Sequence, residues 1–364
     1  ALQTIFAYTF FITGCLLLSV AGFFLLVINP FKRSKAQALF NRMISKTTWA
    51  QLYVMGNLKK RVIYEEKPDF SKPCIFVSNH QSVIDILSMS MLSPRMLLLT
   101  NKWVWNSPLF GYVVRLAGYY PIFEGADPGI ELLKAKIDAG YSIAVFPEGT
   151  RSKDGKIGRF HKGAFYLAQQ LELDIIPVIL HGTGKSIAKG SFTMRDATMT
   201  IKVLKRIKFN DPDFGSTYQQ KTKAVHQLFK VQYSLLEEEF HTPEYLRKRV
   251  IENFLFKGPL VEWYMKVKLK LEDNYLVFQE MVPKQGVIVD AGCGYGFMSY
   301  MLAYLEPKRE ITGLDYDESK IDVAENGFDK PANLNFVSSN LQNFTVPLAD
   351  CIIFSDVLHY LNLQ

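Results

Sequence analysis

Residues 5–28 form an apolar run that contains no charged side chain. About 20 apolar residues in an α-helix are enough to cross the hydrocarbon core of a bilayer. The run is too long for the apolar part of a signal peptide, and no basic segment precedes it. The pattern therefore predicts a helix that spans a membrane or is deeply embedded in it, with a cleaved signal peptide as the alternative.

Between residues 74 and 204, short β-rich runs alternate with helical stretches. The expected strands cover 74–78, 96–100, 119–123, 142–146, 175–180 and 198–204, and the expected helices cover 83–92, 104–117, 128–139 and 162–171. This alternation is typical of an α/β sheet domain. Charged helical segments follow at 218–239 and 243–253, and we expect them to close this domain and lead to a second one.

The expected second domain begins with a helical stretch at 259–280 and continues with a strand, a glycine-rich turn and a helix at 287–305. Further strands are expected at 310–314, 334–338 and 350–355. These segments supply only about four strands of a doubly wound sheet, so we expect a partial Rossmann-like domain. Because later strands are missing, we also expect the natural chain to continue past Gln364. The first residue is Ala1 and not Met, so we expect both ends to be cut from a longer polypeptide.

The predicted fold class is therefore α/β, in three parts. We expect a transmembrane anchor with a basic flank over residues 1–35, an α/β domain over 36–245 and a partial Rossmann-like domain over 255–364.

The positive charge of the chain is concentrated just after the apolar run. Residues 30–61 contain no acidic side chain and eight basic ones, which are Lys32, Arg33, Lys35, Arg42, Lys46, Lys59, Lys60 and Arg61. Subtracting these eight from the 42 Lys and Arg leaves 34 against 35 Asp and Glu, so the net charge of +7 lies in this segment. A basic segment beside a membrane helix marks its cytoplasmic flank and attracts anionic lipid. A solvated helix face is the alternative, and no aromatic-interleaved basic groove indicates nucleic acid.

The four cysteines are far apart and form no C-x-x-C pair. This spacing suggests neither a disulfide framework nor a zinc site, and it fits a reducing, cytosol-facing location. The histidines other than His80 have no metal-ligand spacing either, so we expect no metal.

The first candidate site is the string NHQSVID at 79–85, which follows an apolar run at 74–77. His80 and Asp85 are five residues apart, about 140° around an ideal helix. His80 must therefore precede the helix if Asp85 is to fold back to its ring. In that arrangement Asp85 orients His80 as a general base for a hydroxyl. The alternative is a surface histidine beside a helix N-cap.

The second candidate site is the string FPEGTRS at 146–152, which follows an apolar run at 142–145. Gly149 permits a close backbone approach, and the guanidinium of Arg151 matches the geometry of a phosphate. Open α/β sheets place their active sites at strand ends such as these. We expect an anion site here, with a tight turn and a structural Glu148–Arg151 pair as the alternative.

Taken together, the two strings resemble the lysophospholipid acyltransferase family, which includes 1-acylglycerol-3-phosphate acyltransferases. The resemblance covers about residues 62–204 and includes FHKGA at 160–164 and IPVI at 176–179. It implies that His80 deprotonates the hydroxyl of a lyso-lipid acceptor, which attacks an acyl thioester on coenzyme A or acyl carrier protein. It also implies that the acceptor is bound by Glu148, Gly149, Thr150 and Arg151.

The chain departs from this family at one position. Another family block usually ends in an arginine that helps hold the acceptor phosphate, and the matching stretch at 118–124 ends in Glu124. A carboxylate there would repel a phosphate. Lysophosphatidate is therefore the default acceptor, and we hypothesise a different one, such as an amine-bearing lyso-lipid.

The third candidate site is the string DAGCGYG at 290–296. An NAD-type turn requires its third glycine three positions after the second, where this chain has Phe297. The D-x-G-x-G-x-G form, with Asp315 closing the next strand, resembles class I S-adenosylmethionine-dependent methyltransferases. The resemblance covers residues 259–364 and implies a cofactor site formed by Asp290, Gly292, Gly294, Gly296, Asp315 and Asn340. In it the glycines would lie under the methionine part, Asp315 would bind the ribose, and Asn340 would lie near the adenine.

We therefore predict a membrane-anchored, cytosol-facing acyltransferase joined to an incomplete methyltransferase, with membrane lipids as partners and no nucleic acid. One alternative is a catalytically weak lipid-binding scaffold. The other is a methyltransferase that the acyltransferase-like half tethers to a membrane.

Overall fold

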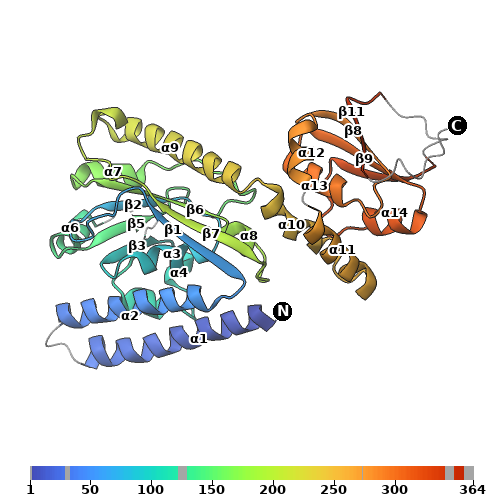
Figure 1. Ribbon diagram of the computed structural model, residues 1–364. Helices are drawn as coiled ribbons and strands as arrows, with labels where there is room; N and C mark the ends of the chain where they lie inside the picture. Colours follow the sequence, from blue (N-terminus) through green and yellow to red (C-terminus); the bar gives the residue numbers. More distant parts are fainter. Residues whose placement is uncertain (1, 29–32, 122–128, 273, 341–347, 356–364) are drawn as a thin grey trace. The chain divides into compact units, whose positions relative to one another are not determined.

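The computed structural model describes residues 2–28, 33–121, 129–272, 274–340 and 348–355 (Figure 1). The chain divides after Leu236 into two compact units. Both units combine helices with a predominantly parallel sheet, so the predicted α/β fold class is confirmed.

A seven-stranded sheet forms the centre of the first unit, in the order β1-β7-β6-β2-β5-β3-β4. Its strands are β1 Leu58–Tyr64, β2 Ile75–Ser78, β3 Met96–Thr100, β4 Tyr120–Pro121, β5 Ser142–Val145, β6 Ile175–His181 and β7 Ala197–Val203. Only the β6–β7 pair is antiparallel among the described strands. The central strands β2, β5 and β6 are buried along their whole lengths, which explains their continuous apolar runs.

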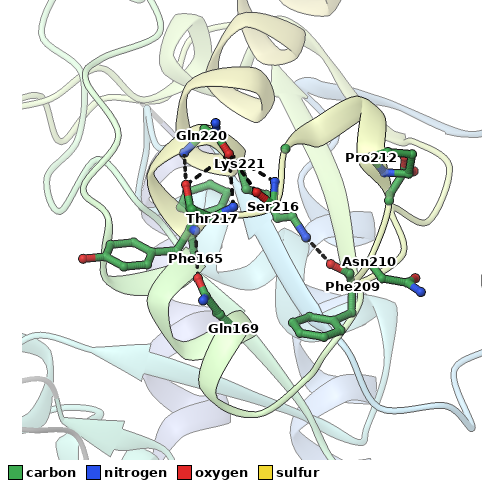
Figure 2. A pocket seen from close by; sticks show the side chains of 12 residues that line it. Phe165, Gln169, Phe209, Asn210, Pro212, Ser216, Thr217, Gln220 and Lys221 are labelled. Carbon is green, nitrogen blue, oxygen red and sulfur yellow. Dashed lines mark hydrogen bonds between the residues drawn. The ribbon is translucent and has the colours of Figure 1, made fainter.

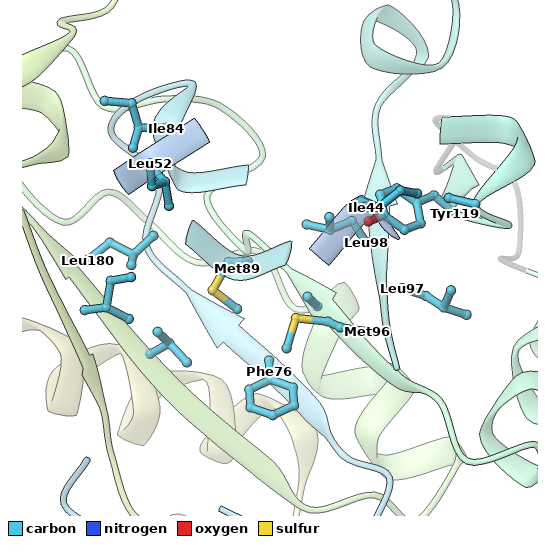
Figure 3. Close-up of a cluster of buried hydrophobic side chains, with 14 of the residues drawn as sticks. Ile44, Leu52, Phe76, Ile84, Met89, Met96, Leu97, Leu98, Tyr119 and Leu180 are labelled. Carbon is cyan, nitrogen blue, oxygen red and sulfur yellow. The ribbon is translucent and has the colours of Figure 1, made fainter. Parts of the chain in front are cut away.

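Helices cover both faces of this sheet (Figure 1). They are α1 Leu2–Gly22, α2 Arg33–Val54, α3 Ile84–Leu92, α4 Lys102–Trp105, α5 Gly111–Leu116, α6 Ile130–Asp138, α7 Gly163–Gln170, α8 Thr183–Ser186 and α9 Tyr218–Glu239. Successive side chains of β2 join different cores because they point to opposite faces. Phe76 packs with Met89 of α3 (Figure 3), whereas Val77 packs in the core that includes Phe229 of α9.

Helix α1 is the expected apolar helix, and it continues as a π-helix, Phe23–Ile28. Residues Leu2–Val27 are long and apolar enough to cross a membrane. In the structure α1 lies along α2 (Figure 1), and Gln51 of α2 donates a hydrogen bond to the carbonyl of Ala7 (2.9 Å). The opposite side of α1 is exposed and apolar, with Leu17 66% exposed. The helix therefore packs on the domain with one face and leaves the other uncovered.

The second unit contains a parallel four-stranded sheet in the order β10-β9-β8-β11. Its strands are β8 Gly286–Ala291, β9 Arg309–Asp315, β10 Leu334–Ser338 and β11 Cys351–Phe354. Its helices are α10 Pro243–Glu252, α11 Pro259–Leu271, α12 Tyr275–Met281, α13 Phe297–Leu305 and α14 Glu318–Glu325. Helix α13 is buried along its whole length between the sheet and the neighbouring helices.

The structure differs from the sequence pattern in the place of one of the two charged helical segments. Helix α9 packs on the first sheet, with Val225 and Phe229 in its core, as expected. Helix α10 belongs instead to the second unit, where Leu246 and Val250 pack in the core that contains α13. Amphipathic periodicity shows that a helix has a buried face but does not show which core receives that face.

Candidate functional site

Strands β2 and β5 lie side by side and run parallel, with Ile75 opposite Ile143 and Val77 opposite Val145. The carboxyl ends of parallel neighbours meet at the same edge of a sheet. The segments after Ser78 and Val145, which carry NHQSVID and FPEGTRS, therefore start next to each other although they are far apart in sequence.

His80 lies in the turn before α3, and Asp85 lies in the first turn of that helix. The ring Nδ1 of His80 is 2.9 Å from Oδ2 of Asp85, so the expected return of the carboxylate to the ring is confirmed. The same oxygen accepts hydrogen bonds from the backbone N–H groups of Gln81 (2.5 Å) and Ser82 (2.7 Å). Asp85 is fully buried, so these contacts hold the carboxylate in one orientation.

The imidazole ring of His80 is fixed on its face as well. It stacks on Phe146 with a centroid distance of 4.3 Å and an interplanar angle of 21°. The side chain is 14% exposed. No described residue forms a hydrogen bond with Nε2, so this nitrogen is open to a substrate.

The buried carboxylate of Glu148 contacts the backbone on two sides. One oxygen accepts from the N–H of His80 (2.9 Å), and the other accepts from the N–H of Gly158 (3.0 Å). Burial raises the pKa of Glu148, and the two backbone N–H groups partly offset this effect. The sequence motif indicates an acceptor ligand at this position, whereas these contacts show a carboxylate that holds the loop of His80.

A further hydrogen bond fixes the same loop at His80. The N–H of Ser152 donates to the carbonyl oxygen of His80 (2.8 Å). Both the N–H and the carbonyl of His80 are therefore bound by the FPEGTRS segment, so the two strings are joined directly.

Thr150 and Arg151 lie at the outer side of the FPEGTRS segment. Thr150 is exposed and Arg151 is partly exposed. The ammonium group of Lys189 donates to the hydroxyl of Thr150 (3.0 Å) and to the carbonyl of Arg151 (2.7 Å). Gly149 forms a tight turn by donating its N–H to the carbonyl of Phe146 (3.1 Å). The expected anion site thus contains a second cation, Lys189, which the sequence did not indicate because it lies on a separate loop.

Other polar residues of the first string have structural roles that sequence reasoning missed. The side-chain amide of Asn79 donates to the carbonyl of Leu180 and accepts from its N–H, both at 2.8 Å. This pair of hydrogen bonds extends the contact between β2 and β6 beyond the end of β2. The side chain of Gln81 donates to the hydroxyl of Tyr233 in α9 (2.6 Å) and to the carbonyl of Gly155 (2.7 Å).

Glu124, which stands where the family has an arginine, lies outside the described residues. The expectation that Glu124 disfavours a phosphate therefore stays a prediction.

A cavity of about 510 Å³ lies elsewhere in the first unit, between α7 and the start of α9 (Figure 2). Its lining includes Phe165, Thr217 and Lys221, and it includes none of the predicted site residues. Gln220 caps the N-terminus of α9 by accepting from the N–H of Thr217 (3.2 Å), and Lys221 donates to the carbonyl of Phe209. Several polar groups of this cavity are thus engaged with one another.

The glycine-rich turn of the second unit leaves the end of β8. The N–H groups of Gly292 and Cys293 donate to the carbonyl of Leu314 (2.7 and 2.8 Å). The N–H of Gly294 donates to one carboxylate oxygen of Asp315 (2.7 Å), and the N–H of Asp317 donates to the other (2.9 Å). The turn and the carboxylate that closes β9 are therefore in direct contact.

The second and third glycines of the turn have different surroundings. A Cβ atom on Gly296 would lie 2.3 Å from the ring of Phe336, so this position has to be glycine for packing. A Cβ atom on Gly294 would meet no atom within 4 Å, so the backbone there is open to a ligand. Gly294 also has a φ of +55°, which other residues rarely adopt.

The two remaining predicted residues lie in different environments. Asn340 is exposed and follows β10, and the N–H of the preceding Ser339 donates to the carbonyl of Asp315 (2.9 Å). Asn340, Asp315 and the turn therefore share one edge of the sheet. Asp290 is buried, and Oδ2 accepts a hydrogen bond from the hydroxyl of Ser299 in α13. Asp290 thus lies beneath the turn and holds α13.

Residues 57–181 match the sequence model of the acyltransferase family, and residues 288–364 match that of a methyltransferase domain family. The chain joins an acyltransferase domain to a methyltransferase domain. The methyltransferase match begins within β8 and includes the glycine-rich turn, and the acyltransferase match includes both strings at the ends of β2 and β5.

Named relatives resemble the acyltransferase part. A chloroplastic 1-acyl-sn-glycerol-3-phosphate acyltransferase of Brassica napus is 32% identical over 189 residues, covering 49% of this chain and 54% of that protein. A chloroplastic protein of the same description from Arabidopsis thaliana is 33% identical over 174 residues, covering 46% of this chain and 47% of that protein. The chain thus spans about half the length of the curated relatives it matches.

The crystal structure of the 1-acyl-sn-glycerophosphate acyltransferase PlsC from Thermotoga maritima has a similar fold. It superimposes with a TM-score of 0.54 at 23% sequence identity, covering 65% of this chain and 95% of that chain. This likeness supports the fold of the acyltransferase domain.

Asp290 leads to a prediction about the pH dependence of stability in the methyltransferase domain. Burial raises the pKa of Asp290 to about 6 from its usual value of 3.8. Between about pH 4 and pH 6 the folded domain then keeps a proton that the unfolded chain has released. The free energy of unfolding should therefore fall as the pH rises through this range, by up to roughly 3 kcal/mol.

Asp290→Asn should remove this fall, which urea unfolding at several pH values would measure. Asp322→Asn, which changes an exposed carboxylate on α14, is the matched control. Equal pH slopes in the parent protein and the Asp290→Asn variant would contradict the assignment.

Proposed function

We propose that the acyltransferase domain transfers an acyl group from a thioester on coenzyme A or acyl carrier protein to the hydroxyl of a lyso-lipid. The default acceptor is 1-acylglycerol-3-phosphate, the substrate class named for the relatives. The observation that carries the proposal is the contact between His80 Nδ1 and Asp85 Oδ2 (2.9 Å), which the hydrogen bond from Ser152 to His80 (2.8 Å) joins to the segment that contains Arg151.

In the proposed mechanism, Asp85 accepts the proton on Nδ1 of His80 in a hydrogen bond and leaves Nε2 unprotonated. Nε2 removes the proton from the acceptor hydroxyl as its oxygen attacks the thioester carbonyl carbon. The carbon–sulfur bond then breaks, and the departing thiolate takes the proton from His80. The products are an ester and a free thiol, and His80 returns to its starting state.

The acceptor headgroup would lie against Arg151, Thr150 and the Gly149 turn. Arg151 supplies a guanidinium fork, the group that best matches a phosphate. Glu148 serves this site indirectly in the proposal, because its carboxylate is occupied by the N–H groups of His80 and Gly158. The function of Glu148 is then to place the base beside the acceptor.

Replacing the proposed base tests this mechanism. His80→Ala should lower kcat for acyl transfer by about 10²- to 10⁴-fold, the usual contribution of a positioned general base. Acyl transfer from a radiolabelled thioester to a lyso-lipid would measure the loss. His241→Ala, in the other unit, is the matched control. Unchanged transfer by His80→Ala would contradict the role of His80 as the base, and negligible transfer by the parent protein would favour the alternative that this domain is a lipid-binding scaffold.

The acceptor itself is the subject of a separate prediction. Because Glu124 would repel a phosphate at the usual arginine position, an amine-bearing or other hydroxylated lipid should be acylated faster than lysophosphatidate. A panel of lyso-lipids of equal chain length, assayed at one thioester concentration, would rank the acceptors. A clear preference for lysophosphatidate would contradict this prediction and support 1-acylglycerol-3-phosphate as the acceptor.

We further propose that the methyltransferase domain, over residues 255–364, binds S-adenosylmethionine and gives the chain a second activity. The residues fit this cofactor: Gly294 leaves its backbone uncovered, and Asp315 retains lone pairs for ribose hydroxyls. Asn340 lies at the same edge and would contact the adenine. The bound cofactor supplies an activated methyl group. In the alternative, methylation is the main activity, and the acyltransferase domain, over residues 36–245, attaches the methyltransferase to a membrane.

Cofactor binding can be tested without knowing the methyl acceptor. Gly294→Val should weaken S-adenosylmethionine binding at least about tenfold, because the side chain would occupy the open side of the turn. Isothermal titration calorimetry would measure the affinity. Gly258→Val is the matched control, since Gly258 also has a positive φ and open surroundings but precedes α11. Equal losses in both variants would contradict a site at the turn.

We propose that α1 attaches the acyltransferase domain to the cytoplasmic face of a membrane through its exposed apolar side. Two observations support this placement. The basic residues Lys35, Arg42 and Lys46 of α2 lie on the helix beside it. Lys189, which donates to the carbonyl of Arg151, lies in the same loop as Met194, whose N–H donates to the hydroxyl of Thr4 in α1. The proposed acceptor site therefore lies close to the helix that would contact the lipid.

A further inference from the structure

The loop between α8 and β7, residues 187–196, carries an exposed aromatic side chain next to the proposed acceptor site. Phe192, near its middle, is 80% exposed. Lys189 and Arg195 flank it on the two sides of the loop, and Asp196 is its one acidic residue. Large exposed aromatic side chains beside cations are typical of protein surfaces that enter a membrane interface.

The base of this loop is firmly held. The N–H of Arg195 donates to the carbonyl of Ser186 (2.9 Å), and the side chain of Asn57 donates to the carbonyl of Arg195 (3.1 Å). Within the loop, the N–H of Ser191 donates to the carbonyl of Ala188 (3.0 Å). Phe192 is therefore presented outward by a hydrogen-bonded support.

Three contacts connect the same loop to the parts of the domain that the proposed function uses. The hydroxyl of Ser82, in the catalytic string, donates to the carbonyl of Ile187 (2.8 Å). Lys189 donates to the carbonyl of Arg151 (2.7 Å). The N–H of Met194 donates to the hydroxyl of Thr4 at the start of α1 (3.2 Å). The loop therefore connects the base, the anion site and the apolar helix.

We propose that this loop is a second membrane contact, in which Phe192 enters the apolar part of the bilayer while Lys189 and Arg195 meet anionic headgroups. The inference rests on the proposed function, because it deepens the account of how the acceptor reaches its site. The bilayer is favoured as the partner because the hydrogen bond from Met194 to Thr4 holds the loop beside the start of α1, where Leu2, Ile5 and Phe6 are exposed. Its flanking charges also complement anionic lipid.

This placement gives Lys189 a part in selecting the acceptor. Its ammonium already contacts the hydroxyl of Thr150 (3.0 Å), at the outer side of the anion site. A lyso-lipid that leaves the bilayer beside Phe192 would meet Lys189 with its headgroup before it reaches Arg151. The polar oxygens of the headgroup are thereby guided toward His80 while the acyl chain stays near the apolar surface.

The depth of position 192 in a bilayer tests the proposal directly. Phe192→Trp in the full chain, reconstituted with vesicles of phosphatidylcholine and phosphatidylglycerol, should be quenched by lipids brominated on their acyl chains beyond the quenching of the parent protein. Leu132→Trp is the matched control. Leu132 is 64% exposed on α6, and α6 packs in the core on the sheet face opposite α2 and α3. Equal quenching of the two variants would overturn the proposal. Absence of quenching at position 192 would overturn it as well, and that is the result expected for a loop that binds a protein.

A kinetic measurement separates this inference from the proposed function. Phe192→Ser should lower the ratio of acylation of a vesicle-borne lyso-lipid to that of a monomeric short-chain analogue by about tenfold, since one aromatic side chain loses its insertion. Phe192→Leu should restore most of that ratio. An unchanged ratio with Phe192→Ser would overturn the inference. Absence of acyl transfer in the parent would contradict the proposed function, and the quenching result would still decide the membrane contact.

Discussion

The structure of the candidate active site depends on the hydrogen bonds that fix the backbone of His80. Glu148 accepts from its N–H and Ser152 donates to its carbonyl, and both belong to the segment that follows β5. Because β2 and β5 are parallel neighbours, these bonds form over a short distance at one edge of the sheet. The orientation that Asp85 gives to the imidazole is useful only because the main chain below it is held in this way.

The same edge of the sheet shows how the proposed catalytic site and the proposed lipid surface can come together in one domain. The loop that follows α8 starts near the catalytic string, contacts Arg151 through Lys189 and reaches α1 through Met194. A lyso-lipid has a polar headgroup and an apolar chain, and it needs a surface that offers both environments within a few residues. Polar groups at the strand ends and the exposed side of α1 supply them.

In the second unit, the glycines of the turn have two different roles. Gly296 has no space for a side chain because the ring of Phe336 packs against it, whereas Gly294 leaves an open surface beside Asp315. Asp290 lies below and is tied to Ser299. The motif therefore combines packing of α13 on the sheet with a backbone that a ligand can approach, which is the usual division of roles in turns of this kind.

The amino-acid sequence by itself determined the α/β class, the apolar N-terminal helix, the placement of two strings at strand ends and the pairing of His80 with Asp85. Each of these follows from local information, namely hydrophobic period, chain length and spacing within a few residues. Only the tertiary structure decided that Glu148 binds the loop of His80, that Lys189 contacts the segment of Arg151 and that α10 packs in the second unit. These contacts connect residues distant in sequence, and they depend on which strands become neighbours and which core receives a helix. The period of a sequence specifies a buried face but not its partner.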